Sequence, residues 1–231
     1  MIPRLVRISP SILCLDYNND LVLKLALEKI EKCGANMVHL DVMDGKFVPN
    51  KSFDHKLVDK IQDMTNLMLD VHLMIENPIK KINDYAQAGA DIITVHYEAC
   101  GDTLEETLKL IKSKNILAGV AISPKTPALK LKDILDTGLV DIVTVMGVNP
   151  GASGQTIIPG SAEKVAEIRD MNKHVYIQID GGVTLKNASI LRRMGANIIV
   201  SSKAIFEAKN IKKAIRALKG NDFINKIFKD I

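Results

Sequence analysis

Two histidines and two aspartates stand where short apolar runs end, and they are the residues with the clearest chemical potential. His39 and Asp41 are two apart, so on a strand their side chains point to the same face. His72 ends a second run, and Asp180 ends another run far along the chain. Imidazole and carboxylate groups ligate divalent transition metals, so the four residues predict a site for one ion of Zn, Fe, Mn or Co.

A less functional interpretation is that His39 and His72 only form hydrogen bonds at a barrel rim, and it is weaker for the set of four than for either histidine alone. His96 also ends an apolar run, but no partner for it can be identified and its role stays open. His55 and His174 are expected to be structural or surface residues.

Three turns rich in glycine and serine predict a phosphate site. Such turns bring backbone N–H groups close to an anion, and barrels often bind phosphate near their last two strands. The candidate residues are Gly151, Ala152, Ser153 and Gly154 within 149–155, then Gly181 and Gly182, then Ser201 and Ser202.

Three methionines, Met43, Met74 and Met146, follow or end predicted strands. They could fill gaps in the core, as methionine often does. They could equally line the mouth of a site and keep water from the reacting groups.

These residues need a scaffold that brings distant strand ends together. One sequence pattern, the end of a helix followed by a glycine and a short apolar run, recurs at Gly34, Gly89, Gly138 and Gly195. This pattern is typical of a helix C-cap followed by a buried strand. The predicted strands are Arg7–Ser11, Met37–Asp41, Leu67–His72, Ile92–His96, Leu117–Ile122, Ile142–Met146, Val175–Asp180 and Ile198–Ser201. Helical patterns cover Asn19–Lys32, Pro78–Ala88, Thr103–Ser113, Ser161–Asp170 and Thr184–Arg193.

Eight alternating units favour an α/β fold, a single (β/α)8 TIM barrel with a closed parallel sheet, over residues 1–231. A doubly wound sheet is the alternative, but no GxGxxG turn follows the first strand. The chemistry of a barrel sits at the C-terminal ends of its strands, where the polar residues fall. Residues 221–231 are expected to form a short helix.

Composition excludes several classes of function. The net charge is +4 without a dense basic stripe, so no nucleic-acid partner is expected. No signal peptide or membrane span is visible, and no membrane partner is expected. Cys14, Cys33 and Cys100 are odd in number and form no CxxC, which fits a reducing cytoplasm better than a disulfide framework.

The stretch from His39 to Asn50 resembles the strand-2 signature of the ribulose-phosphate 3-epimerase family. His72–Met74, Val148–Gln155, Asp180–Gly182 and Ala204–Phe206 follow in the family's order, so the resemblance spans about residues 7–207. It implies a metal-dependent isomerase that interconverts D-ribulose 5-phosphate and D-xylulose 5-phosphate in the pentose phosphate pathway. It also implies a homo-oligomer.

The resemblance implies roles for individual residues. It implies that the metal is ligated by His39, Asp41, His72 and Asp180. It also implies that Asp41 and Asp180 are the acid/base pair. It places Ser11, His72 and the three methionines near the substrate and the metal. One carboxylate would remove the proton from C3 to give an enediolate, and the other carboxylate would return a proton to the opposite face of C3.

Two departures from the family's usual sequence motifs lie in the predicted phosphate turns. The usual Gly-Phe-Gly-Gly-Gln is Gly151-Ala152-Ser153-Gly154-Gln155 here, and the usual Gly-Ser after the last strand is Ser201-Ser202. The stretch from Ser11 to Asp16 also departs from the family's usual sequence and resembles that of the related allulose-6-phosphate 3-epimerases, so activity on allulose 6-phosphate is an alternative. A catalytically silent phosphate-binding barrel is another. Orotidine-phosphate decarboxylase relatives carry a lysine where Met43 stands, which disfavours that reading.

Overall fold

One sheet of eight parallel strands forms the centre of the molecule, in the computed structural model that describes residues 5–220. The hydrogen-bonded order is β1-β8-β7-β6-β5-β4-β3-β2, and a parallel bridge between Ser11 and His39 joins the two ends of the sheet. The predicted (β/α)8 barrel is therefore confirmed. The strands are β1 (Arg7–Pro10), β2 (Met37–Met43), β3 (Met68–Met74), β4 (Ile92–His96), β5 (Leu117–Ile122), β6 (Ile142–Met146), β7 (Tyr176–Asp180) and β8 (Ile198–Ser201).

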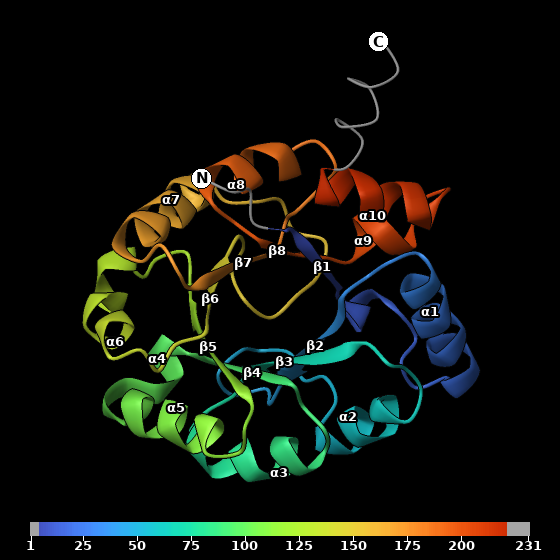
Figure 1. Ribbon diagram of the computed structural model, residues 1–231. Helices are drawn as coiled ribbons and strands as arrows, with labels where there is room; N and C mark the ends of the chain where they lie inside the picture. The colour runs from blue at the N-terminus through green and yellow to red at the C-terminus, as the bar shows by residue number, and fades with distance from the viewer. Residues whose placement is uncertain (1–4, 221–231) are drawn as a thin grey trace.

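Helices surround the sheet as an outer ring (Figure 1). None of them within residues 5–220 is long and apolar enough to cross a membrane. The α-helices are α1 (Asp20–Lys32), α2 (His55–Gln62), α3 (Ile82–Gln87), α4 (Tyr97–Cys100), α5 (Leu104–Lys112), α6 (Lys132–Asp136), α7 (Ser161–Met171), α8 (Ala188–Met194), α9 (Lys203–Phe206) and α10 (Ile211–Lys219). Short 3-10 turns are η1 (Ile12–Cys14), η2 (Pro78–Lys81), η3 (Gly101–Thr103) and η4 (Ala128–Leu131).

Several predicted boundaries shift for local reasons. β2 and β3 run two residues past the predicted ends at Asp41 and His72, because their ladder continues to the pair Met43 and Met74. The helix expected from Thr184 begins at Ala188 instead. Thr184 and Asn187 exchange side-chain hydrogen bonds with each other's backbone N–H and form a turn before it.

The helix expected at 221–231 lies outside the described residues. The single-domain assignment of 1–231 stays a prediction.

The interior of the barrel changes from apolar to polar along its axis. At the N-terminal end, Met37, Ile92, Ile142 and Ile198 come from alternate strands and pack together, as the layers of such barrels do. Above them lies a buried polar layer centred on Asp70, whose Oδ2 accepts hydrogen bonds from Ser9 Oγ (2.8 Å) and Gln178 Nε2 (2.6 Å). This layer forms the floor of the polar mouth.

Candidate metal and active site

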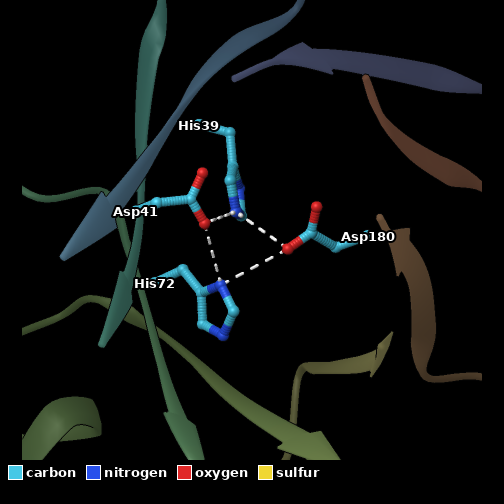
Figure 2. Close-up of side chains that lie close together, drawn as sticks. All are labelled: His39, Asp41, His72 and Asp180. Carbon is cyan, nitrogen blue, oxygen red and sulfur yellow. Dashed lines mark hydrogen bonds and ion pairs between the residues drawn. The ribbon is translucent and has the colours of Figure 1, made fainter. Parts of the chain in front are cut away.

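The four residues singled out in the sequence meet at the C-terminal mouth of the barrel. Figure 2 shows Asp41 and Asp180 approaching from opposite sides, with one nitrogen of each histidine turned toward them. His39 Nε2 and His72 Nδ1 each lie 3.3 Å from Asp41 Oδ1 and 3.5 Å from Asp180 Oδ2. Their predicted convergence is thus confirmed, and the roles of the residues stay a prediction.

Strand register places these side chains. Asp41 on β2 is paired with His72 on β3, and His39 lies two residues earlier on the same face of β2. Asp180 ends β7, where it is paired with Met146 of β6. Each side chain therefore projects from rigid sheet rather than from a loop, so their separations are fixed by the barrel.

The arrangement fits a metal ion. Four ligand atoms, one from each residue, all lie within 4.8 Å of one another. Bonds of about 2.1 Å to a zinc ion put neighbouring ligand atoms roughly 3 to 3.5 Å apart, which agrees with the separations of 3.3 and 3.5 Å in the structure. Among the described residues, His39 Nε2 is a fully buried nitrogen without a hydrogen-bond partner of acceptable geometry. An orphaned buried nitrogen aimed at two carboxylates is well explained as a metal ligand.

Charges in this cluster reinforce each other. Burial by itself lowers the pKa of His39, but attraction to Asp70, Asp41 and Asp180 outweighs it and raises that pKa well above the usual value. The pKa of His72 is also raised, because hydrogen bonds to Asp180 and Asp41 outweigh burial. Burial raises the pKa values of Asp41 and Asp180, yet the histidines lower both on balance. Without metal, these shifts favour the protonated forms of the histidines and the ionised forms of the aspartates.

A buried carboxylate orients His39. Asp70 Oδ2 lies 2.7 Å from His39 Nδ1 and holds the ring so that Nε2 faces the mouth. Asp70 on β3 was not among the site residues predicted from the sequence. Its spacing of two residues before His72 is the signal that could have identified it, because the two side chains share a face.

His96 has partners that the sequence did not reveal. Its Nε2 lies 2.9 Å from His72 Nε2, and its Nδ1 lies 3.1 Å from Glu98 Oε2. Burial lowers the pKa of His96. The pKa of Glu98 falls to about 2 because hydrogen bonds, with His96 first among them, outweigh burial. His55 and His174 lie apart from this cluster, as expected: His55 begins α2 against the ring of Tyr85, and His174 precedes β7.

A cavity of about 510 Å³ opens above the four residues. Asp41 and Asp180 form part of its wall, together with Ser11, whose Oγ donates to Asp41 Oδ2 at 2.7 Å. His39 and His72 are fully buried below the carboxylates. The predicted contact of His72 with substrate therefore has less support than that of Ser11.

The three methionines combine both roles that the sequence allowed. Met43, Met74 and Met146 are almost fully buried, and all three also line the cavity. Met43 and Met74 pack around Val48. They form an apolar wall beside the carboxylates.

The predicted phosphate turns line the far side of the same cavity, including all eight of the candidate glycines, serines and alanine. Gly181 and Gly182 have positive φ angles of 96° and 68°, and a Cβ at Gly182 would lie 2.3 Å from the nitrogen of Ile157. Within residues 5–220, neither Gly182 nor Ser202 donates a backbone hydrogen bond to the chain. Their N–H groups are therefore available to an anion.

Hydrogen bonds brace the longest of these turns. Gln155 Nε2 donates to the carbonyls of Asn149 (2.8 Å) and Ala152 (2.9 Å), and Asn50 Nδ2 donates to the carbonyl of Gly151 (2.7 Å). The altered turn is thus still a closed, supported structure.

One cation at this end was missed in the sequence. Lys203 begins α9 and lines the cavity, and a Cβ at Gly154 would lie 3.0 Å from its Nζ. It is the one lysine or arginine among the described residues that form the cavity wall. Only the fold brings it beside residue 154, so no local sequence signal could have found it.

The chain is a (β/α)8-barrel enzyme with carboxylates at its mouth and a turn-lined pocket suited to an anion.

Comparisons with known proteins identify the family. The sequence model of the Ribulose-phosphate 3 epimerase family matches residues 7–206. Ribulose-phosphate 3-epimerase of Bacillus subtilis is 39% identical over 222 residues, which cover 94% of this chain and 100% of that protein. The chloroplastic ribulose-5-phosphate-3-epimerase of Arabidopsis thaliana is 39% identical over 219 residues, covering 93% of this chain and 76% of that protein. The chain belongs to the ribulose-phosphate 3-epimerase family and is an isomerase that acts on carbohydrates.

Solved structures with little sequence identity share the fold alone. 3-Keto-L-gulonate-6-phosphate decarboxylase from Vibrio cholerae has a TM-score of 0.72 at 13% identity, covering 94% of this chain and 98% of its own. A 3-hexulose-6-phosphate synthase has a TM-score of 0.66 at 17% identity, covering 93% and 98%.

Proposed function

We propose that the chain is a metal-dependent 3-epimerase that interconverts D-ribulose 5-phosphate and D-xylulose 5-phosphate. The observation that carries the proposal is the placement of Asp41 and Asp180. They come from strands on opposite sides of one cavity and share two buried histidines. Family membership supports the same activity.

His39, Asp41, His72 and Asp180 would hold one divalent ion, of Zn, Fe, Mn or Co. When bound, the ion supplies a Lewis acid that stabilises negative charge on the substrate oxygens and makes the C3 proton more acidic. This permits carboxylates, which are weak bases, to take part in proton transfer.

Asp41 and Asp180 would move the protons. One carboxylate removes the proton from C3 on one face, and the electron pair of the C–H bond passes into an enediolate. The other, in its protonated form, returns a proton to C3 on the opposite face. The first carboxylic acid and the second carboxylate then regain their starting states by proton exchange with water. Ser11 holds one carboxylate in place through the hydrogen bond to Asp41 Oδ2.

The far turns would bind the phosphate. Unpaired N–H groups at Gly182 and Ser202 and the ammonium of Lys203 all border the cavity. An anchored phosphate fixes the carbon chain so that C3 stays between the two carboxylates in both directions of the reaction. The methionine wall limits water near the enediolate.

The direct test measures turnover in deuterated water. Ribulose 5-phosphate should convert to xylulose 5-phosphate with deuterium entering C3. A strong chelator should abolish the reaction, and a divalent metal should restore it. Full activity of metal-stripped protein would remove the ion from the proposal.

The same assay should include allulose 6-phosphate, since the altered phosphate turns leave the hexulose as the alternative substrate. A higher kcat/KM for allulose 6-phosphate than for ribulose 5-phosphate would contradict the assignment of the pentulose. Binding of sugar phosphate without deuterium exchange would point instead to a silent barrel.

The setting of the enzyme remains a prediction. The three cysteines are free thiols, which supports a reducing cytoplasm. A homo-oligomer, as the family resemblance implies, is best tested by light scattering of the purified chain.

A further inference from the structure

A line of hydrogen-bonded side chains, two fully buried histidines and one partly exposed glutamate, runs away from the proposed metal site through β3, β4 and α4. It begins at His72, continues through His96 and ends at Glu98. Neither His96 nor Glu98 borders the cavity, so neither touches substrate. The inference drawn from this line rests on the proposed metal site.

The first step concerns the proton on His72. Its Nδ1 faces Asp41 and Asp180, and Figure 2 shows its other ring nitrogen pointing away from both carboxylates. A neutral imidazole that ligates through Nδ1 carries its proton on Nε2. His72 Nε2 must therefore act as a hydrogen-bond donor.

The second step fixes the tautomer of His96. The two Nε2 atoms are 2.9 Å apart, the ring centroids are 5.0 Å apart, and the ring planes differ by only 20°. The edges that carry Nε2 thus face each other, as a hydrogen bond between rings requires. Because His72 donates, His96 Nε2 must accept, and the proton of a neutral His96 lies on Nδ1.

The third step is the acceptor for that proton. Glu98 Oε2 lies 3.1 Å from His96 Nδ1. Glu98 Oε1 accepts from the backbone N–H of Ser123 at 2.8 Å and from the hydroxyl of Thr126. Both carboxylate oxygens are therefore committed, so the carboxylate cannot rotate without losing a hydrogen bond.

The loop that holds Glu98 is itself fixed. Lys164 on α7 donates to the carbonyls of Ser123 (3.0 Å), Pro124 (2.9 Å) and Thr126 (2.7 Å). An ammonium with three carbonyl acceptors uses all its donors. The support of His72 thus extends from β3 to a helix on the outer ring.

We propose that His96 and Glu98 are positioning residues that hold His72 in the tautomer required for metal ligation through Nδ1. Every donor in the line points toward the carboxylate, and the line ends on a fixed acceptor. His39 is supported differently, by the direct contact of its Nδ1 with Asp70. The two histidines are therefore oriented by separate carboxylates, one direct and one relayed through a second imidazole. Such outer partners typically change metal affinity 10- to 100-fold.

The test is the variant Glu98→Gln, which keeps the size of the side chain. It reverses the direction in which the hydrogen bond between residue 98 and His96 is donated. The amide oxygen can still accept from Ser123 and Thr126, so the amide nitrogen then faces His96 Nδ1 as a donor. His96 would have to carry its proton on Nε2, where it meets the proton of His72. We expect zinc affinity, measured by competition with a chromophoric chelator, to fall about 10- to 100-fold.

The matched control is Glu76→Gln. Glu76 is exposed and lies just past β3 at the same end of the barrel. Its replacement by glutamine removes the same negative charge as Glu98→Gln. Its zinc affinity should equal that of the wild type. Equal affinities of Glu98→Gln and wild type, with only a lower melting temperature for the variant, would overturn the proposal and leave the epimerase assignment intact. A wild type that binds no divalent metal would overturn both.

A second measurement reads the tautomers directly. In zinc-loaded protein labelled with nitrogen-15 at histidine, NMR should show His72 protonated at Nε2 and His96 protonated at Nδ1. Zinc ligation by His72 through Nε2, or a proton on Nε2 of His96, would contradict the proposed line whatever the activity.

Discussion

Asp41 uses its two carboxylate oxygens differently. Oδ2 accepts from Ser11, while Oδ1 faces both histidines. Asp180 presents one oxygen to the same histidines from the other side of the mouth. Each aspartate therefore belongs both to the metal cluster and to the wall of the cavity, which a two-base mechanism requires of its acid and base.

Replacing either aspartate by asparagine should reduce kcat about 10²- to 10⁴-fold, because one face of C3 loses its proton carrier. Each variant should still exchange the C3 proton of one epimer with deuterated water, and the two variants should act on opposite epimers. NMR of each epimer in deuterated water measures this.

The metal content of both variants must be determined beside the kinetics, since both residues are proposed ligands. A metal-loaded variant with near wild-type turnover, or two variants that exchange the same epimer, would be incompatible with one base on each face.

At the scale of elements, the phosphate end depends on turns rather than on strands. The turn after β7 requires glycine for two reasons: a positive φ at Gly182 and the close approach of the Ile157 backbone. The turn after β8 places Lys203 over Gly154 of the loop before α7. Three connections from different parts of the chain thus form one pocket.

Gly182→Ala should disturb this pocket and leave the carboxylates in place. The added methyl group meets the Ile157 backbone at 2.3 to 2.6 Å, so the turn must move. We expect a loss of stability of about 1–3 kcal/mol, from the strained backbone, and a higher KM for the ketose phosphate. Denaturant unfolding and steady-state kinetics check the two parts. Gly138→Ala is a useful control, since Gly138 also has a positive φ but no atom within 4 Å of the added Cβ. Equal KM values for both variants would contradict a phosphate site at Gly182.

Lys203→Met removes the ammonium and keeps most of the side chain's length. If Lys203 contacts the phosphate, KM should rise about fivefold with little change in kcat, the size expected of an exposed charge contact. The difference from wild type should shrink at high salt. Lys209→Met, an exposed lysine outside the cavity, is the control. An unchanged KM at low salt would remove Lys203 from the phosphate site.

At the scale of the whole molecule, the sequence predicted what is periodic or local. The eight apolar runs became the eight strands, and the rule that polar strand ends face one mouth brought His39, Asp41, His72 and Asp180 together. What it could not predict depends on register and on loops. The partner of His96 is known only once β3 lies beside β4, and the groups that donate hydrogen bonds to Glu98 come from Ser123 and Thr126.

Closure of the barrel also concentrates charge, and this has a measurable consequence for metal binding. The pKa values of His39 and His72 are raised above 6.5 in the metal-free protein, while those of Asp41 and Asp180 are lowered. At pH 6.5 each imidazole is therefore more than half protonated, and the carboxylates are ionised. Metal ligation needs neutral imidazoles, so binding must displace protons from the histidines and none from the aspartates.

Zinc binding at pH 6.5 should consequently release more than one proton per ion. The number should fall as pH rises through the raised pKa values, and zinc affinity should strengthen over the same range, because fewer protons compete. Calorimetric titrations in two buffers with different ionisation enthalpies measure the number at each pH. The variant His39→Asn provides the comparison, since it lacks one displaced proton and should release about one fewer. Release of less than half a proton by the wild type at pH 6.5 would mean that the ion does not bind between these histidines.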